Sequence, residues 1–96
     1  MEIVNIEILQ DFARKNSGLR NISDSWISIV KDSNWGRRQD VFDSFPRVDY
    51  NFRHKAYIFN LGGNFRLIAR ISFSAGYVSV LDILNHDDCM KWSNRG

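Results

Sequence analysis

The sequence contains one cysteine, Cys89, and one proline, Pro46. A single cysteine excludes an internal disulfide framework and any zinc site built from several cysteines, and it is typical of a chain in a reducing compartment. The apolar runs are far too short to cross a bilayer, and Met1–Ile8 lacks the pattern of a signal peptide. We therefore expect a cytoplasmic protein that does not enter a membrane.

Charge is unevenly distributed along a chain that is too short for a second core. The 96 residues predict one domain over 1–96. Residues 35–70 carry seven basic and three acidic groups, a net charge of +4. Residues 1–34 carry four basic and five acidic groups, and residues 71–96 carry two and three, so both flanking parts have a net charge of −1. Taken alone, this asymmetry indicates no more than a solvated positive face.

Apolar spacing and turn residues predict helices in the first half of the chain and strands in the second. Met1–Val4 is a short strand or a tail. Asn5 is suited to cap a helix that runs to about Lys15, and a second helix begins near Asn21 or Ser23 and ends around residues 33–34. A short helical turn over residues 39–44 precedes Pro46. Three strands separated by glycine-containing turns and a last short helix then follow, over Tyr57–Leu61, Phe65–Phe73, Tyr77–Leu84 and Asp87–Trp92.

This order predicts an α+β domain in which the N-terminal helices pack on one face of an antiparallel β-meander, with a short C-terminal helix. The opposite face of the sheet would then be concave, partly open and basic. Side chains alternate between the faces of a strand, so Arg66 and Arg70 share that opposite face with Ile68. The pattern alone leaves two interpretations of these arginines: a phosphate site on a rigid sheet, or surface salt bridges with Asp82 or Asp49.

Three segments of the second half form a recognisable set: AYIFNLGGN (56–64), RLIARISF (66–73) and NHDDCMKW (85–92). Trp35 and FPRVD (45–49) add to it. The chain resembles the HigB-type toxins of bacterial type II toxin–antitoxin systems, in the RelE-like superfamily. The resemblance implies a RelE-like toxin fold and a ribosome-associated mRNA endonuclease (an mRNA interferase) that inhibits translation. It also implies a HigA-type helix-turn-helix antitoxin as partner, with DNA contacted only through the antitoxin complex.

Metal-independent RNA cleavage uses the 2′-hydroxyl of the substrate as nucleophile, so it requires proton transfer and fixed cations at the phosphate but no metal or cofactor. Arg66 and Arg70 suit the phosphate role because a guanidinium grips two oxygens and stays charged. The resemblance favours Arg66 of the two. It also makes His86 the first choice for general acid or base, since imidazole exchanges protons near neutral pH. A helix cap is the competing interpretation of His86.

Further basic residues are candidates for proton transfer or for RNA binding. Arg53, His54 and Lys55 precede the first strand of the meander. If Lys55 has the same parity as the core-facing Tyr57, His54 points to the opposite face, which makes His54 the second choice for proton transfer. The candidate substrate contacts are Arg53, Lys55, Asn64, Arg37 and Arg38. Tolerance of positive φ would also explain Asn64, and solvated surface would explain Arg37 and Arg38.

Two other functions remain open at this stage. A toxin of the same superfold could inhibit a protein target such as DNA gyrase without cleaving RNA. A basic RNA-binding module would use the same arginines without a correctly placed base. Cleavage differs from both because it requires a proton-transfer group beside the phosphate site.

Overall fold

The computed structural model describes residues 1–95 and contains one five-stranded sheet in the order β1-β5-β4-β3-β2. Neighbouring strands are antiparallel except for β1, which runs parallel to β5. The strands are β1 (Glu2–Val4), β2 (Asp49–Asn51), β3 (Ala56–Asn60), β4 (Phe65–Ser72) and β5 (Tyr77–Asn85). The helices are α1 (Ile6–Lys15), α2 (Arg20–Asp32), α3 (Arg38–Ser44) and α4 (His86–Asn94), with a 3₁₀ turn, η1 (Ser17–Leu19), before α2.

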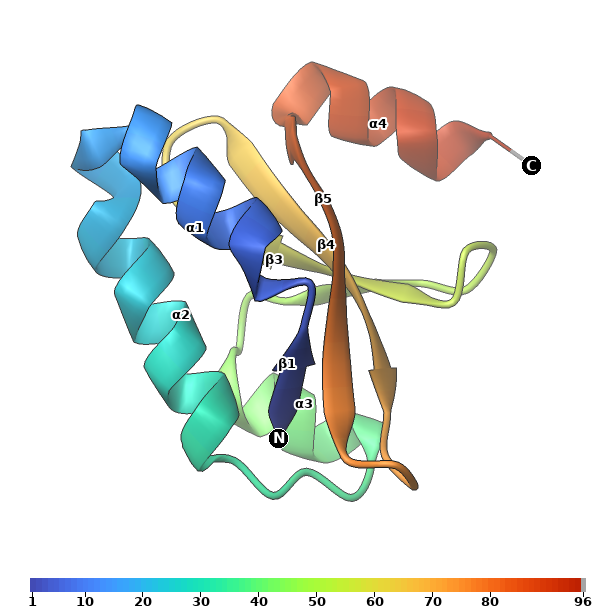
Figure 1. Cartoon of the computed structure of the whole chain (residues 1–96). Coiled ribbons are helices and arrows are strands. Elements are labelled where there is room, and N and C mark those ends of the chain that lie inside the picture. The colour runs from blue at the N-terminus through green and yellow to red at the C-terminus, as the bar shows by residue number, and fades with distance from the viewer. Residues whose placement is uncertain (96) are drawn as a thin grey trace.

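The helices α1 and α2 cover one face of the sheet (Figure 1). Leu9, Trp26 and Val30 are the buried residues of these helices that belong to the main core. They pack with sheet residues that include Phe59, Leu67, Val78 and Val80. The predicted α+β arrangement of helices on an antiparallel sheet, with a short C-terminal helix, is therefore confirmed.

The second face of the sheet is less open than expected because α4 packs against β4 and β5 there. A second, smaller cluster of buried residues joins Ala56 and Ile68 of the sheet to Cys89 of α4. Leu81, Leu84 and Trp92 pack against it. The predicted alternation along β4 holds, since Leu67 and Ala69 face the main core while Ile68 faces α4.

A β-bulge interrupts the pairing of β4 with β5. Ile68 pairs with Asp82 and Ala69 pairs with Val80, so Leu81 is an extra residue in β5. An extra residue reverses the side-chain alternation beyond it. Val80 accordingly faces the main core, and beyond the bulge Ile83 does so as well. The bulge therefore changes which positions of β5 face the main core, from Val78 and Val80 before it to Ile83 after it.

Several local predictions were wrong. Asn5 is the N-cap residue of α1, as predicted, but its side chain does not cap the helix: it has φ 61°, and its Nδ2 donates to the carbonyl of Val80 at 3.4 Å. α2 begins at Arg20, one residue before Asn21, so of the two predicted starts only Ser23 was wrong; Ser23 lies inside the helix, and its Oγ donates to the carbonyl of Leu19 at 2.8 Å. The edge strand β2 was not predicted, because three residues are too few to show an alternating pattern. Among residues 1–95, every helix is too short or too polar to cross a lipid bilayer.

Candidate active site

A cavity of about 200 Å³ lies between α4 and the sheet and brings Arg66 and His86 together. Arg66 reaches it from β4, and His86 reaches it from the start of α4. The residues that line the cavity are Asp49, Ile58, Arg66, His86, Cys89, Met90, Ser93 and Asn94. Two of the four residues proposed for catalysis thus line one cavity, although they are twenty positions apart in the sequence.

Arg66 is held by neutral acceptors. Its Nη1 donates to Asn60 Oδ1 at 3.3 Å and to the carbonyl of Phe65 at 3.0 Å. The salt bridges found within residues 1–95 are Arg14–Asp11 and Arg37–Asp40, so neither Asp49 nor Asp82 neutralises Arg66. Its positive charge is therefore available to an anion that enters the cavity.

His86 is the first residue of α4, and its backbone position follows from a helix cap. The cap is Asn85, whose Oδ1 accepts a hydrogen bond from the N–H of Asp88 at 2.8 Å. Asn85 therefore has the capping role that was the competing interpretation of His86. Within the described residues the imidazole has no hydrogen-bond partner, and the side chain is exposed at the cavity.

Arg70 and His54 lie together, outside the cavity lining. The guanidinium of Arg70 donates to the carbonyl of His54 through Nε at 3.3 Å and Nη2 at 3.2 Å. Arg66 and Arg70 share a face, as their parity predicts, but four residues of strand separate them by about 13 Å. The imidazole of His54 stacks on Trp92 with 4.1 Å between ring centroids, and its Nε2 lies 2.7 Å from the Trp92 carbonyl. A carbonyl only accepts, so Nε2 carries the proton here.

The premise of the parity argument for His54 was wrong, because Arg53, His54 and Lys55 lie in the turn between β2 and β3 and not in a strand. His54 nevertheless lies on the predicted side of the sheet, against Trp92 and Arg70. Lys55 has φ 53°, and the N–H of His54 donates to Asn51 Oδ1 at 2.9 Å, which closes the turn. Arg53 Nη1 donates to the carbonyl of Asn94 at 2.9 Å, so this turn is attached to the end of α4. Arg53 and Lys55 do not line the cavity.

The remaining predicted contacts lie elsewhere on the surface. Arg37 forms an ion pair with Asp40 at 3.8 Å. The guanidinium of Arg38 lies 4.0 Å from the ring centroid of Tyr50 and 5.1 Å from that of Phe52. Asn64 lies in the β3–β4 turn, where Gly62 and Gly63, and not Asn64, have positive φ. None of these three predicted residues lines the cavity.

Sequence reasoning missed two residues that shape the site, Asn60 and Met90, and one exposed aromatic ring outside the cavity, that of Phe52. Asn60 holds Arg66, and its place in the FNLGGN segment was the available signal. Met90 gives the cavity an exposed apolar side. Phe52 lies on the β2–β3 turn and is 74% exposed. Its ring centroid is 5.1 Å from the guanidinium of Arg38, which belongs to α3. The sequence did not reveal this exposure, because a phenylalanine in the sequence is compatible with either a buried or an exposed position.

Cys89 is buried in the floor of the cavity with 6% of its surface exposed. Burial raises the pKa of its thiol above the ordinary value of 9.0, outweighing a hydrogen bond to Ser93 and the charge of Arg66. The thiol is therefore protonated at neutral pH and is not an activated nucleophile. No group of three or more His, Cys, Asp or Glu residues within residues 1–95 is arranged to hold a metal ion.

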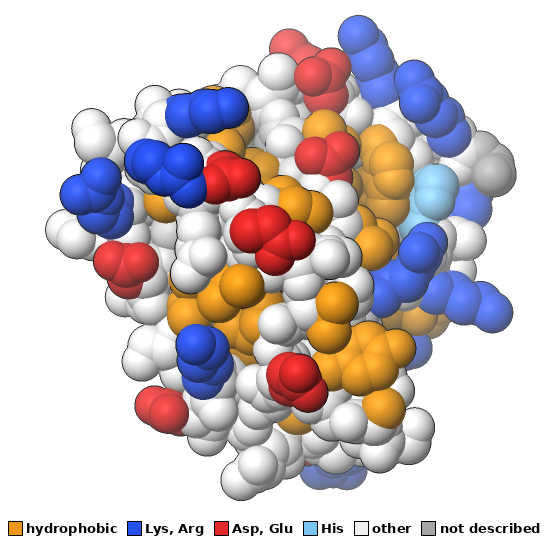
Figure 2. Space-filling view, viewed as in Figure 1, with side chains coloured by type: hydrophobic (Ala, Val, Ile, Leu, Met, Phe, Trp, Pro, Cys, Tyr) orange, Lys and Arg blue, Asp and Glu red, His pale blue; other side chains and the backbone are white. Residues whose placement is uncertain are grey.

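Basic side chains gather along one side of this end of the molecule, whereas the first turn of α4 carries Asp87 and Asp88. Figure 2 shows Lys and Arg side chains gathered on the side where the end of α4 and the β2–β3 turn lie. The cavity, its free guanidinium and the basic side chains around it form a site suited to an anion. A family model described as "HigB_toxin, RelE-like toxic component of a toxin-antitoxin system" matches residues 20–91 of the chain.

The chain belongs to the HigB toxin family. The matched region includes Arg66 and His86 and extends from the start of α2 into α4. A search of curated proteins found no match. Membership makes the chain a toxin of a toxin–antitoxin system, which has an antitoxin as its partner, and the sheet with its helices is consistent with a RelE-like fold.

Proposed function

We propose that this HigB toxin is an mRNA endonuclease that acts on the translating ribosome and so inhibits translation. The observation that carries the proposal is the shared cavity of Arg66 and His86. A cation fixed beside a proton-transfer group is the minimum that metal-independent RNA cleavage requires. Family membership supports the same activity, because the resemblance described above implies an mRNA interferase.

In the proposed reaction, the 2′-hydroxyl of one nucleotide attacks the adjacent phosphorus. The hydroxyl loses its proton, the bond to the 5′-oxygen breaks, and that oxygen receives a proton. The products are a 2′,3′-cyclic phosphate and a free 5′-hydroxyl. Arg66 binds the non-bridging oxygens, whose negative charge increases in the transition state. His86 exchanges a proton with one of the two reacting oxygens.

Residues outside the cavity bind the flanking RNA in this proposal. Arg70, Arg53 and Lys55 lie on or beside the turn that is attached to the end of α4, and they supply positive charge to the RNA backbone. Phe52 has an exposed ring on which a base can stack, a contact that tolerates any base. His54 accepts from Arg70 through its carbonyl and stacks on Trp92, so we assign it the role of positioning these two side chains.

The proposal is tested by inducing the chain in a bacterial host, with and without the neighbouring antitoxin gene, and mapping new mRNA 5′ ends. We expect growth arrest and new 5′-hydroxyl ends inside coding sequences, both suppressed by the antitoxin. Growth arrest without new ends would contradict cleavage and would instead favour inhibition of a protein target or RNA binding alone. A helix-turn-helix protein of the HigA type is the antitoxin that we propose.

A further inference from the structure

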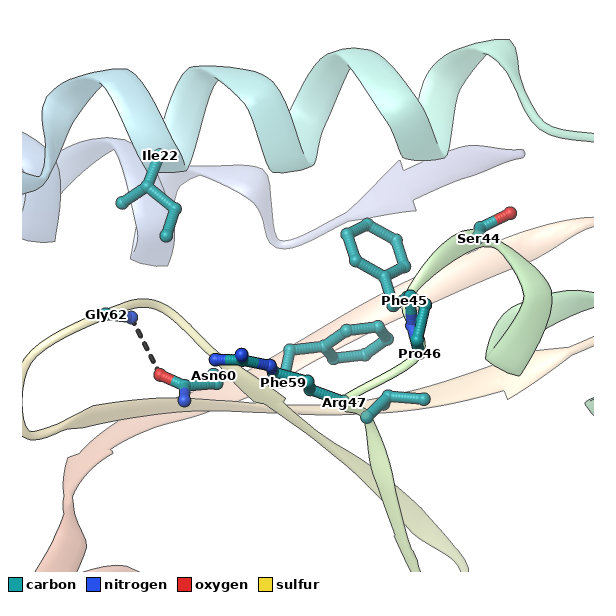
Figure 3. Close-up of a pocket in the computed structure, with 9 residues that line it drawn as sticks. Ile22, Ser44, Phe45, Pro46, Arg47, Phe59, Asn60 and Gly62 are labelled. Carbon is teal, nitrogen blue, oxygen red and sulfur yellow. Dashed lines mark hydrogen bonds between the residues drawn. The ribbon is translucent and has the colours of Figure 1, made fainter.

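A second cavity, of about 400 Å³, lies on the opposite face of the sheet from the Arg66 and His86 site. Phe59 lines it and faces the helices, whereas the neighbouring Ile58 faces α4. Its walls come from the start of α2, the segment 44–48 and the β3–β4 turn (Figure 3). The apolar residues that line it are Ile22, Phe45, Pro46, Val48 and Phe59.

Arg47 is the one charged residue that lines this cavity within the described chain. Figure 3 shows its side chain extending along the cavity toward Asn60. Among residues 1–95, Arg47 takes part in no salt bridge, and its side chain has no hydrogen-bond partner. Of the residues that the structure describes, no Asp or Glu lines the cavity. The charge complement of this surface is therefore a carboxylate next to an apolar group.

We propose that this cavity is the docking site of the antitoxin, and that it binds a segment with a bulky apolar side chain and a neighbouring Asp or Glu. The volume lies within the roughly 300–1,000 Å³ of typical binding pockets. Arginine and aromatic residues at the centre of an apolar patch are also the residues that dominate protein–protein affinity. An antitoxin partner follows from family membership, so the proposal does not depend on RNA cleavage.

The docked segment lies next to Asn60, which connects the two cavities. Asn60 lines the docking cavity, and its Oδ1 accepts hydrogen bonds from the N–H of Gly62 at 2.8 Å and from Arg66 at 3.3 Å. An antitoxin that binds here touches the residue that holds Arg66 while the Arg66 and His86 cavity stays open on the other face. Neutralisation then acts through the position of Arg66 and does not need the catalytic cavity to be filled.

The test measures the affinity of the purified toxin for its cognate antitoxin by titration calorimetry. Ile22→Ser removes part of the apolar lining that would bind the apolar side chain. Arg47→Glu replaces the positive charge that would bind the neighbouring carboxylate. Matched controls are Ile29→Ser, which changes an equally exposed isoleucine of the same helix (39% against 38%), and the exposed Lys31→Glu. We expect each test variant to bind at least about tenfold more weakly, and each control to stay within about twofold.

A second readout separates docking from misfolding and from the nuclease proposal. The thermal unfolding of each variant is compared with that of the original chain, and growth inhibition is measured without antitoxin. Under the proposal, Arg47→Glu folds, still arrests growth and is no longer rescued by the antitoxin. The proposal is overturned if both test variants bind the antitoxin as tightly as the controls do. It is also overturned if Arg47→Glu loses toxicity but keeps its affinity for the antitoxin.

Discussion

The environment of Arg66 decides what this residue can do. Its guanidinium is oriented by the side chain of Asn60 and by the carbonyl of Phe65, and no carboxylate within residues 1–95 forms a salt bridge with it. Neutral acceptors fix the direction of a cation without cancelling its charge, which is the condition for binding a phosphate at a defined position. Arg70, four residues further along β4, is instead turned toward the carbonyl of His54.

Cys89 predicts a loss of stability in alkaline solution. Burial raises the pKa of its thiol, so the folded chain keeps a proton that the unfolded chain releases above about pH 9.0. The unfolded state then binds fewer protons, and the free energy of unfolding decreases as the pH rises through that range. Urea unfolding between about pH 8 and 10 should show a smaller decrease for Cys89→Ala than for the original chain. Tyr57, whose pKa burial also raises, accounts for part of the decrease that is left.

An identical pH dependence in Cys89→Ala and the original chain would contradict this account of the thiol. Tyr57→Phe is the matched control because it removes a second buried group that titrates at higher pH and lies outside the cavity. It should reduce the loss mainly at the upper end of the range.

Single residues also show where sequence reasoning succeeds. Alternation along β4 placed Arg66 and Ile68 on the face that α4 covers, because this strand is long and regular. His54 lies on the predicted face, but the turn that contains it was taken for a strand, because that turn exists only through the pairing of Asp49–Asn51 with β3. That pairing depends on partners several residues away, and no local periodicity reveals it.

At the scale of elements, α4 determines the position of His86. Asn85 caps the helix by accepting from Asp88, and His86 follows it directly. Asn85→Ala should lower the free energy of unfolding by about 0.5–2 kcal/mol, the usual cost of a lost cap. It should also reduce RNA cleavage, since the first turn of α4 carries His86 into the cavity.

Asn21→Ala provides the control for this prediction, because Asn21 is an exposed residue inside α2 and its side chain has no hydrogen bond among the described residues. Alanine favours a helix, so this variant should be as stable as the original chain or slightly more stable. Equal stability of Asn85→Ala and Asn21→Ala, measured by urea unfolding, would show that the cap is unimportant.

The order of the elements was predictable, but their pairing was predictable only in part. Glycine-containing turns join β3, β4 and β5 and make an antiparallel meander the simplest arrangement. The parallel pairing of β1 with β5 joins Glu2–Val4 to residues some seventy-five positions later. Nothing in three N-terminal residues specifies that partner. The bulge at Leu81 could not be predicted from the sequence either, because an apolar residue is compatible with both faces of the sheet.

The whole molecule presents two different surfaces on the two faces of its sheet. On the face that α4 partly covers, the cavity of Arg66 and His86 lies near the basic side chains of the β2–β3 turn. On the face that α1 and α2 cover, an apolar cavity contains Arg47. Positive charge beside a proton-transfer group suits RNA, and an apolar cavity with one arginine suits a protein segment. A toxin that must meet both RNA and an antitoxin has room for both.

Cleavage in a translating extract tests the central claim, which is that Arg66 and His86 act together on one phosphate. The cleavage rate of a defined mRNA is compared for the original chain, Arg66→Ala, His86→Ala and Arg70→Ala. Loss of a fixed cation or of a proton-transfer group should each slow cleavage by about 10²-fold or more. Arg70→Ala, outside the cavity, should slow it by less than about tenfold. Cleavage by His86→Ala or Arg66→Ala at the rate of the original chain would contradict the account.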